Sequence, residues 1–146
     1  MVILEDTRQQ AGKHDNLSDL DVVRSKLPFG DYALPPKIAV DTKASLHEIT
    51  QNLCGSQKER ARFIRECKLA KECGAVLVFL IETGAYKVPA DLIEQDILLL
   101  SGKRVPGVQL YRAMMIVSER YGCRFEFCPR ADTGKRIMEI LSDGVK

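Results

Sequence analysis

Two aspartates and a lysine lie close together around a pair of prolines in the segment GDYALPPKIAVDTK, residues 30–43. Short apolar runs on both sides of the prolines predict a β-hairpin with a proline-stiffened turn. If the chain folds back at Pro36, Asp31 faces Asp41 across the two strands. Facing carboxylates destabilise a sheet by up to about 1 kcal/mol. A divalent cation bound between them would reverse the sign of that interaction.

The same register gives the hairpin an apolar face and a charged face, because side chains alternate across a strand. The apolar face carries Tyr32, Leu34, Ile38, Val40 and Thr42. The charged face carries Asp31, Ala33, Ala39, Asp41 and Lys43. We expect the two small alanines to leave room for a substrate backbone. A slip of one residue would mix the two faces, which favours this register.

The charged face has two interpretations. In the first, Asp31 and Asp41 bind Mg²⁺, a hard ion that prefers one or two carboxylates together with water and phosphate oxygens. Lys43 would then position the attacking water or stabilise negative charge that develops on a phosphate. In the second, the face is an exposed polar surface on which Lys43 only neutralises the aspartates. This spacing occurs by chance in many proteins, so the hairpin alone leaves both interpretations open.

The flanking segments predict an α/β fold in which one mixed β-sheet is flanked by helices. Two S-x-x-E capping patterns, at Ser45 and Ser56, predict helices over 46–54 and from 57 to about 73. A continuous apolar run at 75–81 predicts a central strand that is covered on both faces. The other expected elements are strands at 1–7, 20–28 and 123–127, a polar loop at 8–19, a partly helical segment at 89–100, a break at 103–107, and helices at 108–121 and 133–142.

Length, composition and charge narrow the class of protein. The 146 residues suffice for one domain, expected to cover residues 1–146, and 45% hydrophobic with 29% charged residues is typical of a soluble globular protein. The longest apolar run is too short to span a bilayer, and the N-terminus lacks a signal-peptide pattern, so we expect a cytoplasmic or nucleoid-associated location. The net charge of +2 is too small to demonstrate a nucleic-acid partner. The five cysteines are expected to be reduced and mostly buried.

A basic stripe follows the predicted helix after Ser56. Its members recur every three or four residues, opposite the apolar side of the helix, and are Lys58, Arg62, Arg65 and Lys68. One explanation is a solvated charged surface. The other is contact with DNA phosphates, which positions a duplex without reading its sequence. Such a DNA-binding surface would be extended by Lys103, Arg104, Lys135 and Arg136.

Three segments, taken in order, resemble the PD-(D/E)XK nuclease core and, more closely, the XPF-type structure-specific endonuclease domain. The pattern of that domain is VDxRE on the first strand, GD on a later strand, and ERKxxxD running into a helix. LEDTRQ matches it at Asp6 and Arg8, GDY matches it fully, and DTKASLH matches it in charge at Asp41 and in identity at Lys43. Order, spacing and expected elements agree from residue 3 to about residue 81, whereas the C-terminal third agrees only in general type.

The resemblance implies a restriction-endonuclease-like fold and a Mg²⁺- or Mn²⁺-dependent endonuclease that hydrolyses phosphodiester bonds in branched or flapped DNA. Repair or recombination is the expected process, with a phage or prophage gene as one source. By resemblance, Asp31 and Asp41 bind the metal, Lys43 is the catalytic lysine, and Asp6 helps to bind metal or to position water. Arg8 and the basic stripe would contact DNA.

Members of the family often carry a helix-hairpin-helix DNA-binding domain after the nuclease, and these 146 residues leave no room for one. We therefore expect the protein to act alone, as a homodimer, or with a partner protein that supplies further DNA binding.

Three departures from the family pattern support a second hypothesis, an inert nuclease-like module that binds DNA or a partner nuclease. Gln9 stands where the family has glutamate, Thr42 replaces arginine, and His47 takes the place of the final aspartate. His47 or Glu48, in the first turn of the following helix, would substitute for that aspartate, unless His47 is only a surface residue. Both aspartates of the hairpin and its lysine are retained, which argues for the enzyme.

Overall fold

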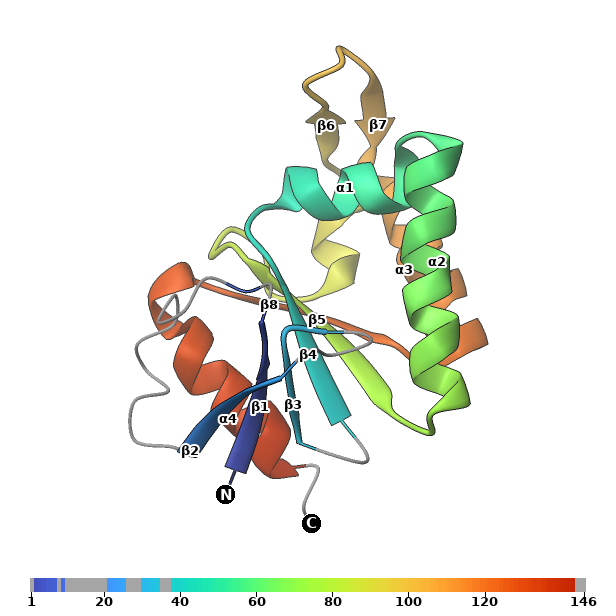
Figure 1. Cartoon of the computed structure of the whole chain (residues 1–146). Helices are drawn as coiled ribbons and strands as arrows, with labels where there is room; N and C mark the ends of the chain where they lie inside the picture. The colour runs from blue at the N-terminus through green and yellow to red at the C-terminus, as the bar shows by residue number, and fades with distance from the viewer. Residues whose placement is uncertain (1, 8, 10–20, 26–29, 35–37, 144–146) are drawn as a thin grey trace.

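A six-stranded mixed β-sheet runs through the centre of the computed structural model (Figure 1). The structure describes residues 2–7, 9, 21–25, 30–34 and 38–143. The strand order is β2-β1-β3-β4-β5-β8, in which β3 pairs antiparallel with both of its neighbours and the other pairs are parallel. The strands are β1 Val2–Asp6, β2 Asp21–Ser25, β3 Tyr32–Leu34, β4 Ile38–Lys43, β5 Val76–Glu82 and β8 Arg124–Cys128. The predicted α/β class with one mixed sheet is confirmed.

The β3–β4 hairpin has the predicted register. Tyr32 pairs with Val40, and the pairs Ala33 with Ala39 and Leu34 with Ile38 follow. The ladder does not continue in register beyond β3, because the Asp31 N–H donates at 2.7 Å to the carbonyl of Val40, the residue that already pairs with Tyr32. Asp31 is therefore not a direct ladder partner of Asp41, but the side chains of the two residues interact as expected. The proline turn at 35–37 and, apart from Gln9, the predicted loop at 8–19 lie outside the described residues.

Both predicted capping patterns begin helices. The Ser45 hydroxyl accepts the Glu48 N–H at 3.2 Å at the start of α1 (Leu46–Cys54), and the Ser56 hydroxyl accepts the Glu59 N–H at 3.2 Å at the start of α2 (Gln57–Glu72). These side chains satisfy amide groups that have no partner within the helix. The later helices α3 (Gly107–Tyr121) and α4 (Thr133–Asp143) also lie where they were predicted. No helix in the described part of the chain is long and apolar enough to cross a membrane.

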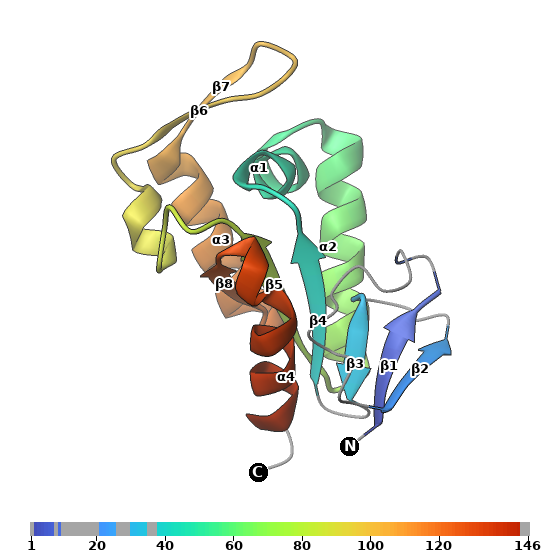
Figure 2. The ribbon, with the colours of Figure 1, turned by 90° about the vertical axis from the view of Figure 1, so that its left-hand side faces the viewer.

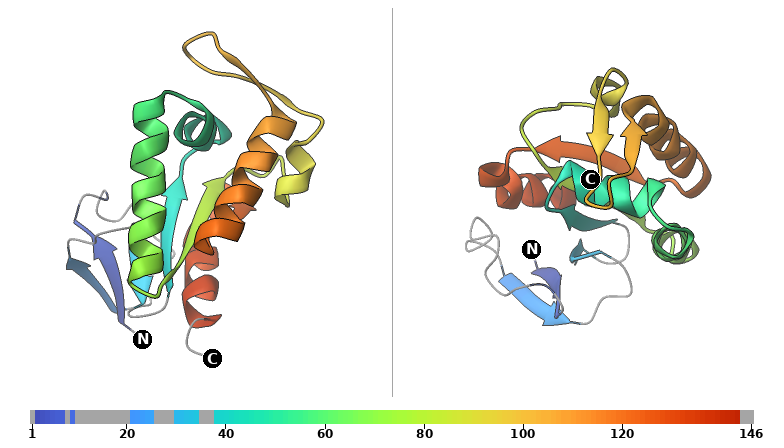
Figure 3. Two further views of the ribbon diagram at one scale, coloured as in Figure 1. Left: turned by 90° about the vertical axis from the view of Figure 1, so that its right-hand side faces the viewer. Right: turned by 90° about the horizontal axis from the view of Figure 1, so that it is seen from above.

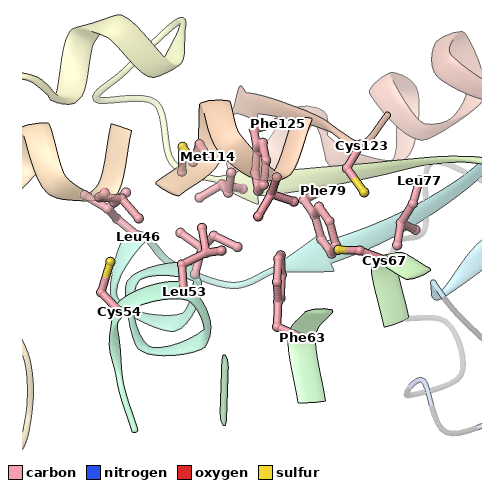
Figure 4. Packing of buried hydrophobic residues seen from close by; sticks show 14 of the residues in the cluster. Leu46, Leu53, Cys54, Phe63, Cys67, Leu77, Phe79, Met114, Cys123 and Phe125 are labelled. Atoms are coloured by element: carbon pink, nitrogen blue, oxygen red, sulfur yellow. The ribbon is translucent and has the colours of Figure 1, made fainter. Parts of the chain in front are cut away.

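Helices cover both faces of the sheet. Figures 2 and 3 show α4 on one side of the sheet and α1, α2 and α3 on the other. On the three-helix side, the rings of Phe63 and Phe79 stack at 4.6 Å, and Phe79 and Phe125 stack at 5.3 Å (Figure 4). Four of the five cysteines are buried, as predicted. On the other side, a second apolar cluster joins α4 to the sheet and includes Tyr32, Val40, Val78, Leu80, Ile137, Ile140 and Leu141.

The expected space for a substrate above the hairpin alanines is not present. Ala33 is 9% exposed and Ala39 is 1% exposed, and both belong to the apolar cluster beneath α1, α2 and α3. The prediction was wrong because it treated that face of the hairpin as open, whereas the helices that follow β4 fold back over it. The residues Asp31, Asp41 and Lys43 lie at the end of the hairpin, beyond these covered alanines.

The segment 89–100 is helical only at its start. A 3₁₀ turn, Pro89–Leu92, is followed by β6 (Asp96–Leu98), which pairs antiparallel with β7 (Arg104–Pro106). This small hairpin projects beyond α1 in Figure 1. The predicted break in helical structure at 103–107 is confirmed, since α3 begins only at Gly107, but the strand β7 within it was not predicted. Each strand has three residues, of which only the central one, Ile97 or Val105, is buried. A single buried residue is too little to give a recognisable alternating pattern in the sequence.

Candidate active site

Three aspartates occupy neighbouring positions on three adjacent strands. Asp41 lies near the end of β4, Asp31 immediately precedes β3, and Asp6 ends β1. The Asp6 N–H donates to the Asp31 carbonyl at 2.6 Å, which ties the ends of β1 and β3 together. Asp6 is 3% exposed and Asp41 is 8% exposed. The fold thus brings the Asp31 and Asp41 side chains into contact and places the main chain of Asp6 beside Asp31, although the three residues come from separate segments of the chain.

Gly30 sets the position of Asp31. Its φ of 71° lies in the left-handed region, which other residues rarely adopt. A Cβ atom at this position would lie 3.2 Å from the Ala39 Cβ and 3.2 Å from the Val40 carbonyl oxygen. Only glycine therefore allows the chain to enter β3 so close to β4. This is the structural reason for a glycine directly before the first hairpin aspartate.

The Asp31 carboxylate is oriented by Thr42. One carboxylate oxygen of Asp31 accepts both the Thr42 N–H at 2.8 Å and the Thr42 hydroxyl at 2.9 Å. In a longer β3, a main-chain carbonyl would accept the Thr42 N–H. Here the Asp31 carboxylate accepts it instead. Thr42 was expected on the apolar face of the hairpin, but its hydroxyl points to Asp31 because the strand ladder gives way to this side chain. The residue that replaces the family arginine thus supports a proposed metal ligand.

Lys43 is held between carboxylates and aromatic rings. Its Nζ lies 3.4 Å from the Asp41 Oδ2, and both side chains are 12% exposed. The same Nζ lies 5.9 Å from the centre of the Phe63 ring and 5.8 Å from that of Phe79. Burial alone would lower the pKa of Lys43, but the charges of Asp41, Glu66 and Glu48 outweigh burial and raise that pKa. The ammonium group is therefore a fixed positive charge at the end of β4.

The Asp41 carboxyl group is destabilised in its charged form. Burial, with further contributions from the charges of Glu66 and Asp31, raises its pKa well above the ordinary value of 3.8, although Lys43 acts in the opposite direction. A buried carboxyl group that interacts directly with a second, half-buried one is unfavourable in its charged form in the absence of a cation. The expectation of a polar, fully solvated hairpin face does not fit this burial.

Glu66, on α2, is a member of this cluster that the sequence reasoning missed. Its Oε1 accepts the Gly30 N–H at 2.8 Å, and its charge acts on both Asp41 and Lys43. Glu66 follows Phe63 by three residues and therefore lies at the edge of the buried side of α2. A carboxylate at the border of an apolar helix face was the available signal. This signal is weak in the sequence, because a single glutamate at such a border is also typical of an ordinary solvated helix edge.

The basic stripe on α2 is divided between two surfaces. Lys58 and Arg62 line a pocket of about 390 Å³ together with Lys43 and Glu66. Arg65 and Lys68 instead line a separate, more apolar hollow beside Ile64 and Leu69. Only the first half of the stripe shares a pocket with Lys43 and Glu66. Arg8, the other expected DNA contact, lies outside the described residues.

The residues expected to extend the stripe do not continue it. The Lys103 Nζ donates to the Cys54 carbonyl at 2.8 Å, where it caps α1, and Arg104 forms an ion pair with Asp96 at 2.7 Å. Lys135 and Arg136 lie on α4, on the opposite face of the sheet (Figure 2). Arg136 is paired there with Glu126 and Glu139. The expectation of one continuous basic surface is therefore wrong.

The two other departures from the family pattern, His47 and Gln9, lie in different surroundings. His47 is exposed, and the neighbouring Glu48 carboxylate lies 4.0 Å from the Lys43 Nζ. Glu48 is thus the first-turn carboxylate that reaches the cluster. Gln9 interacts with the side chain of Tyr32, which belongs to the core beneath α4. Gln9 therefore contacts the face of the sheet that α4 covers, which is opposite to α2.

The donor set at the end of the hairpin fits Mg²⁺. The described residues contain no group of three or more histidine, cysteine or acidic side chains that could hold a metal ion. Mg²⁺ commonly uses only one or two carboxylates and completes its shell with water and substrate phosphate oxygens. Asp31 and Asp41 offer two such hard oxygen donors, and their buried repulsion is the feature that a cation would relieve.

No protein-family model and no curated protein sequence matches the chain. Among solved structures, XPF from Aeropyrum pernix superposes over 100% of the chain with a TM-score of 0.72 and 19% sequence identity. A structure of XPF from the same organism in complex with DNA matches over 99% of the chain, with a TM-score of 0.70 and 19% identity. The chain spans 66% and 64% of the lengths of those two chains. These likenesses confirm the expected fold: the chain has the α/β fold of an XPF-type nuclease.

Proposed function

We propose that the protein is a Mg²⁺- or Mn²⁺-dependent endonuclease that hydrolyses phosphodiester bonds in branched or flapped DNA. The observation that carries this proposal is the convergence of Asp31, Asp41 and Lys43 at the open end of the β3–β4 hairpin. The fold shared with XPF from Aeropyrum pernix, and the DNA bound in one of its structures, support the choice of substrate.

In this proposal Asp31 and Asp41 hold the metal, and Thr42 and Gly30 keep Asp31 in place. A bound Mg²⁺ supplies Lewis acidity toward the phosphate and lowers the pKa of bound water. Asp6 joins the ends of β1 and β3 through its main chain. In this proposal its carboxylate would help to bind the metal or to position water.

Lys43 acts through its fixed positive charge. Hydrolysis forms a bond from a water oxygen to phosphorus and breaks one ester bond, so negative charge grows on the phosphate oxygens and on the leaving oxygen. A preorganised ammonium stabilises such charge strongly in a site with little water. Because the pKa of Lys43 is raised, the group enters the reaction protonated and orients water by donating hydrogen bonds.

The surface beside the cluster provides the DNA contact. Lys58 and Arg62 lie on the same side of α2 as Lys43 and would neutralise phosphates flanking the cleaved bond. Further DNA affinity would come from a second copy of the chain or from a partner protein, in keeping with the modest net charge of +2.

The test is a cleavage panel of labelled flap, fork, four-way junction, single-stranded and continuous duplex DNA with Mg²⁺ or Mn²⁺. We expect Asp41→Asn and Lys43→Ala to lower cleavage by about a hundredfold or more, the usual cost of removing a preorganised charge. Matched controls are Asp132→Asn and Lys87→Ala, which change exposed residues outside the cluster. Circular dichroism would establish that each variant is folded. Unchanged cleavage by folded Asp41→Asn would refute the proposal, and DNA binding without any cleavage would identify the inert module instead.

A further inference from the structure

The pocket beside Lys43 has features that cleavage chemistry alone does not require. It is bounded by the end of β4, by α1 and by the N-terminal half of α2, and its volume is about 390 Å³. This lies within the range of roughly 300–1,000 Å³ typical of small-molecule sites. Its lining is mainly polar and includes Lys43, Asn52, Ser56, Lys58, Arg62 and Glu66.

Two cations at this pocket form no ion pair, although Lys43 is paired with Asp41 and two carboxylates, Glu59 and Glu66, also line it. The Glu59 carboxylate already accepts from Gln51 at 2.9 Å and from Ser56 at 3.3 Å, and Glu66 accepts the Gly30 N–H. Within the described part of the chain, neither Lys58 nor Arg62 has a hydrogen-bond or ion-pair partner. Two free cations at the border of a pocket are suited to an anionic group such as a phosphate.

The pocket also contains the side-chain amide of Asn52, whose oxygen has no hydrogen-bond partner among the described residues. This oxygen is buried. Leaving a buried acceptor unpaired costs about 1–3 kcal/mol, so such atoms are rare and each requires a physical explanation, of which a bound donor is one. An amide side chain can pair with the edge of a nucleic-acid base, because it offers an acceptor and donors side by side.

We propose that this pocket receives one unpaired nucleotide of the cleaved strand, next to the bond that is cut. The phosphate would lie against Lys58 and Arg62, and the base edge would donate to Asn52. A base within a continuous duplex is stacked and paired, so entry would require its extrusion, which costs a few kcal/mol. The pocket thus gives a physical reason for preferring DNA with an unpaired base at the cleavage position. This inference rests on the proposed function, because only the proposed endonuclease activity places a cleaved bond beside the pocket.

Binding without metal tests the pocket separately from catalysis. The full-length chain and its variants are titrated with a short single-stranded oligonucleotide and with a paired duplex of the same length. We expect Asn52→Ala to weaken single-strand binding about threefold to tenfold, as for one lost neutral hydrogen bond, and to leave duplex binding unchanged. Arg62→Gln should also weaken single-strand binding, whereas the matched control Arg65→Gln, on the other surface of α2, should change it less.

A stability measurement separates this role from a purely structural one. Because the Asn52 oxygen has no partner in the described residues, Asn52→Ala should not lower the melting temperature. A marked fall would show that Asn52 serves packing rather than a ligand, and would overturn the proposal.

A cycle between protein and DNA identifies the contacted group. A flap substrate with an abasic nucleotide beside the cleavage position should bind the parent protein more weakly, and Asn52→Ala should no longer distinguish it from the normal flap. Equal weakening of single-strand and duplex binding, or fully additive effects of the two changes, would mean that only phosphates are contacted and would overturn the proposal. If no substrate is cleaved at all, the proposed hydrolysis fails, while these metal-free titrations still decide the role of the pocket.

Discussion

At the residue scale, the position of one carboxylate depends on a glycine that has no side chain to contribute. Gly30 combines a φ of 71° with a close approach to β4, and its N–H is held by Glu66. Asp31 follows directly and is fixed from the other side by Thr42. Backbone conformation, packing and hydrogen bonding thus act together on a single proposed ligand.

Gly30→Ala should therefore lower the free energy of unfolding by more than the replacement of a left-handed glycine usually does. The control is Gly74→Ala, which has the same φ of 71° but nothing within 4 Å of an added Cβ. Both variants pay about 1–2 kcal/mol for the backbone conformation, and Gly30→Ala should lose at least ~1 kcal/mol more for its two contacts at 3.2 Å. Urea unfolding measures both costs, and Mn²⁺ titration should show weaker binding only for Gly30→Ala. Equal losses of stability would contradict this account of the position.

Metal affinity should rise with pH because a proton competes for the Asp41 carboxylate. The pKa of Asp41 is raised well above 3.8 by burial and by the charges of Glu66 and Asp31, so the carboxyl group ionises only at higher pH. Mn²⁺ affinity measured calorimetrically from about pH 5 to pH 8 should increase until this group is fully ionised. Asp41→Asn should bind more weakly and with a flatter pH profile. A pH-independent affinity in the parent protein would argue against Asp41 as a ligand.

At the element scale, α2 contributes residues to the apolar core, to the carboxylate cluster and to two different surface hollows. Phe63, Cys67 and Ala70 are buried against the sheet, while Glu66 reaches back to Gly30. At about 100° per residue, a spacing of four and a spacing of three rotate the stripe in opposite senses, so Arg62 and Arg65 lie about 60° apart on the helix. Lys58 and Arg62 line the pocket, whereas Arg65 and Lys68 line another hollow.

Charge reversal along α2 should reveal this division. Arg62→Glu should weaken flap DNA binding about fivefold or more, the effect of losing a contact to a charged phosphate. Arg65→Glu makes the same change three residues away and should have a clearly smaller effect. Fluorescence anisotropy at constant ionic strength is the appropriate measurement. A larger loss for Arg65→Glu would place the DNA on the opposite side of the helix.

At the scale of the whole molecule, DNA binding should depend only moderately on salt. The net charge is +2, and the cations on α4 lie on the far face of the sheet from α2. Two phosphate contacts, from Lys58 and Arg62, predict a slope of about −2 in a plot of log affinity against log salt concentration. Titration of duplex DNA between low and moderate salt measures this slope. A slope several units steeper would require a wider basic surface than the described residues provide.

Much of the fold could be predicted because its signals are local. The capping pairs Ser45 with Glu48 and Ser56 with Glu59 gave both helix starts, since the capping serine and its amide partner lie within one turn. The β3–β4 register followed from the separation of polar and apolar residues on two short strands. The β6–β7 hairpin was missed because its strands have three residues each and owe their burial to packing against distant elements.

The sequence by itself determined the α/β class, the hairpin that brings Asp31 to Asp41, and the order of motifs that resembles an XPF-type nuclease. Only the tertiary structure decided that Glu66 and Thr42 belong to the cluster, that Ala33 and Ala39 are covered, and that the basic stripe is split. The physical reason is range: caps and strand alternation act between residues near each other in sequence. The burial and neighbours of a charge, in contrast, depend on helices that return from elsewhere in the chain, as α2 does when Glu66 meets Gly30 across 36 positions.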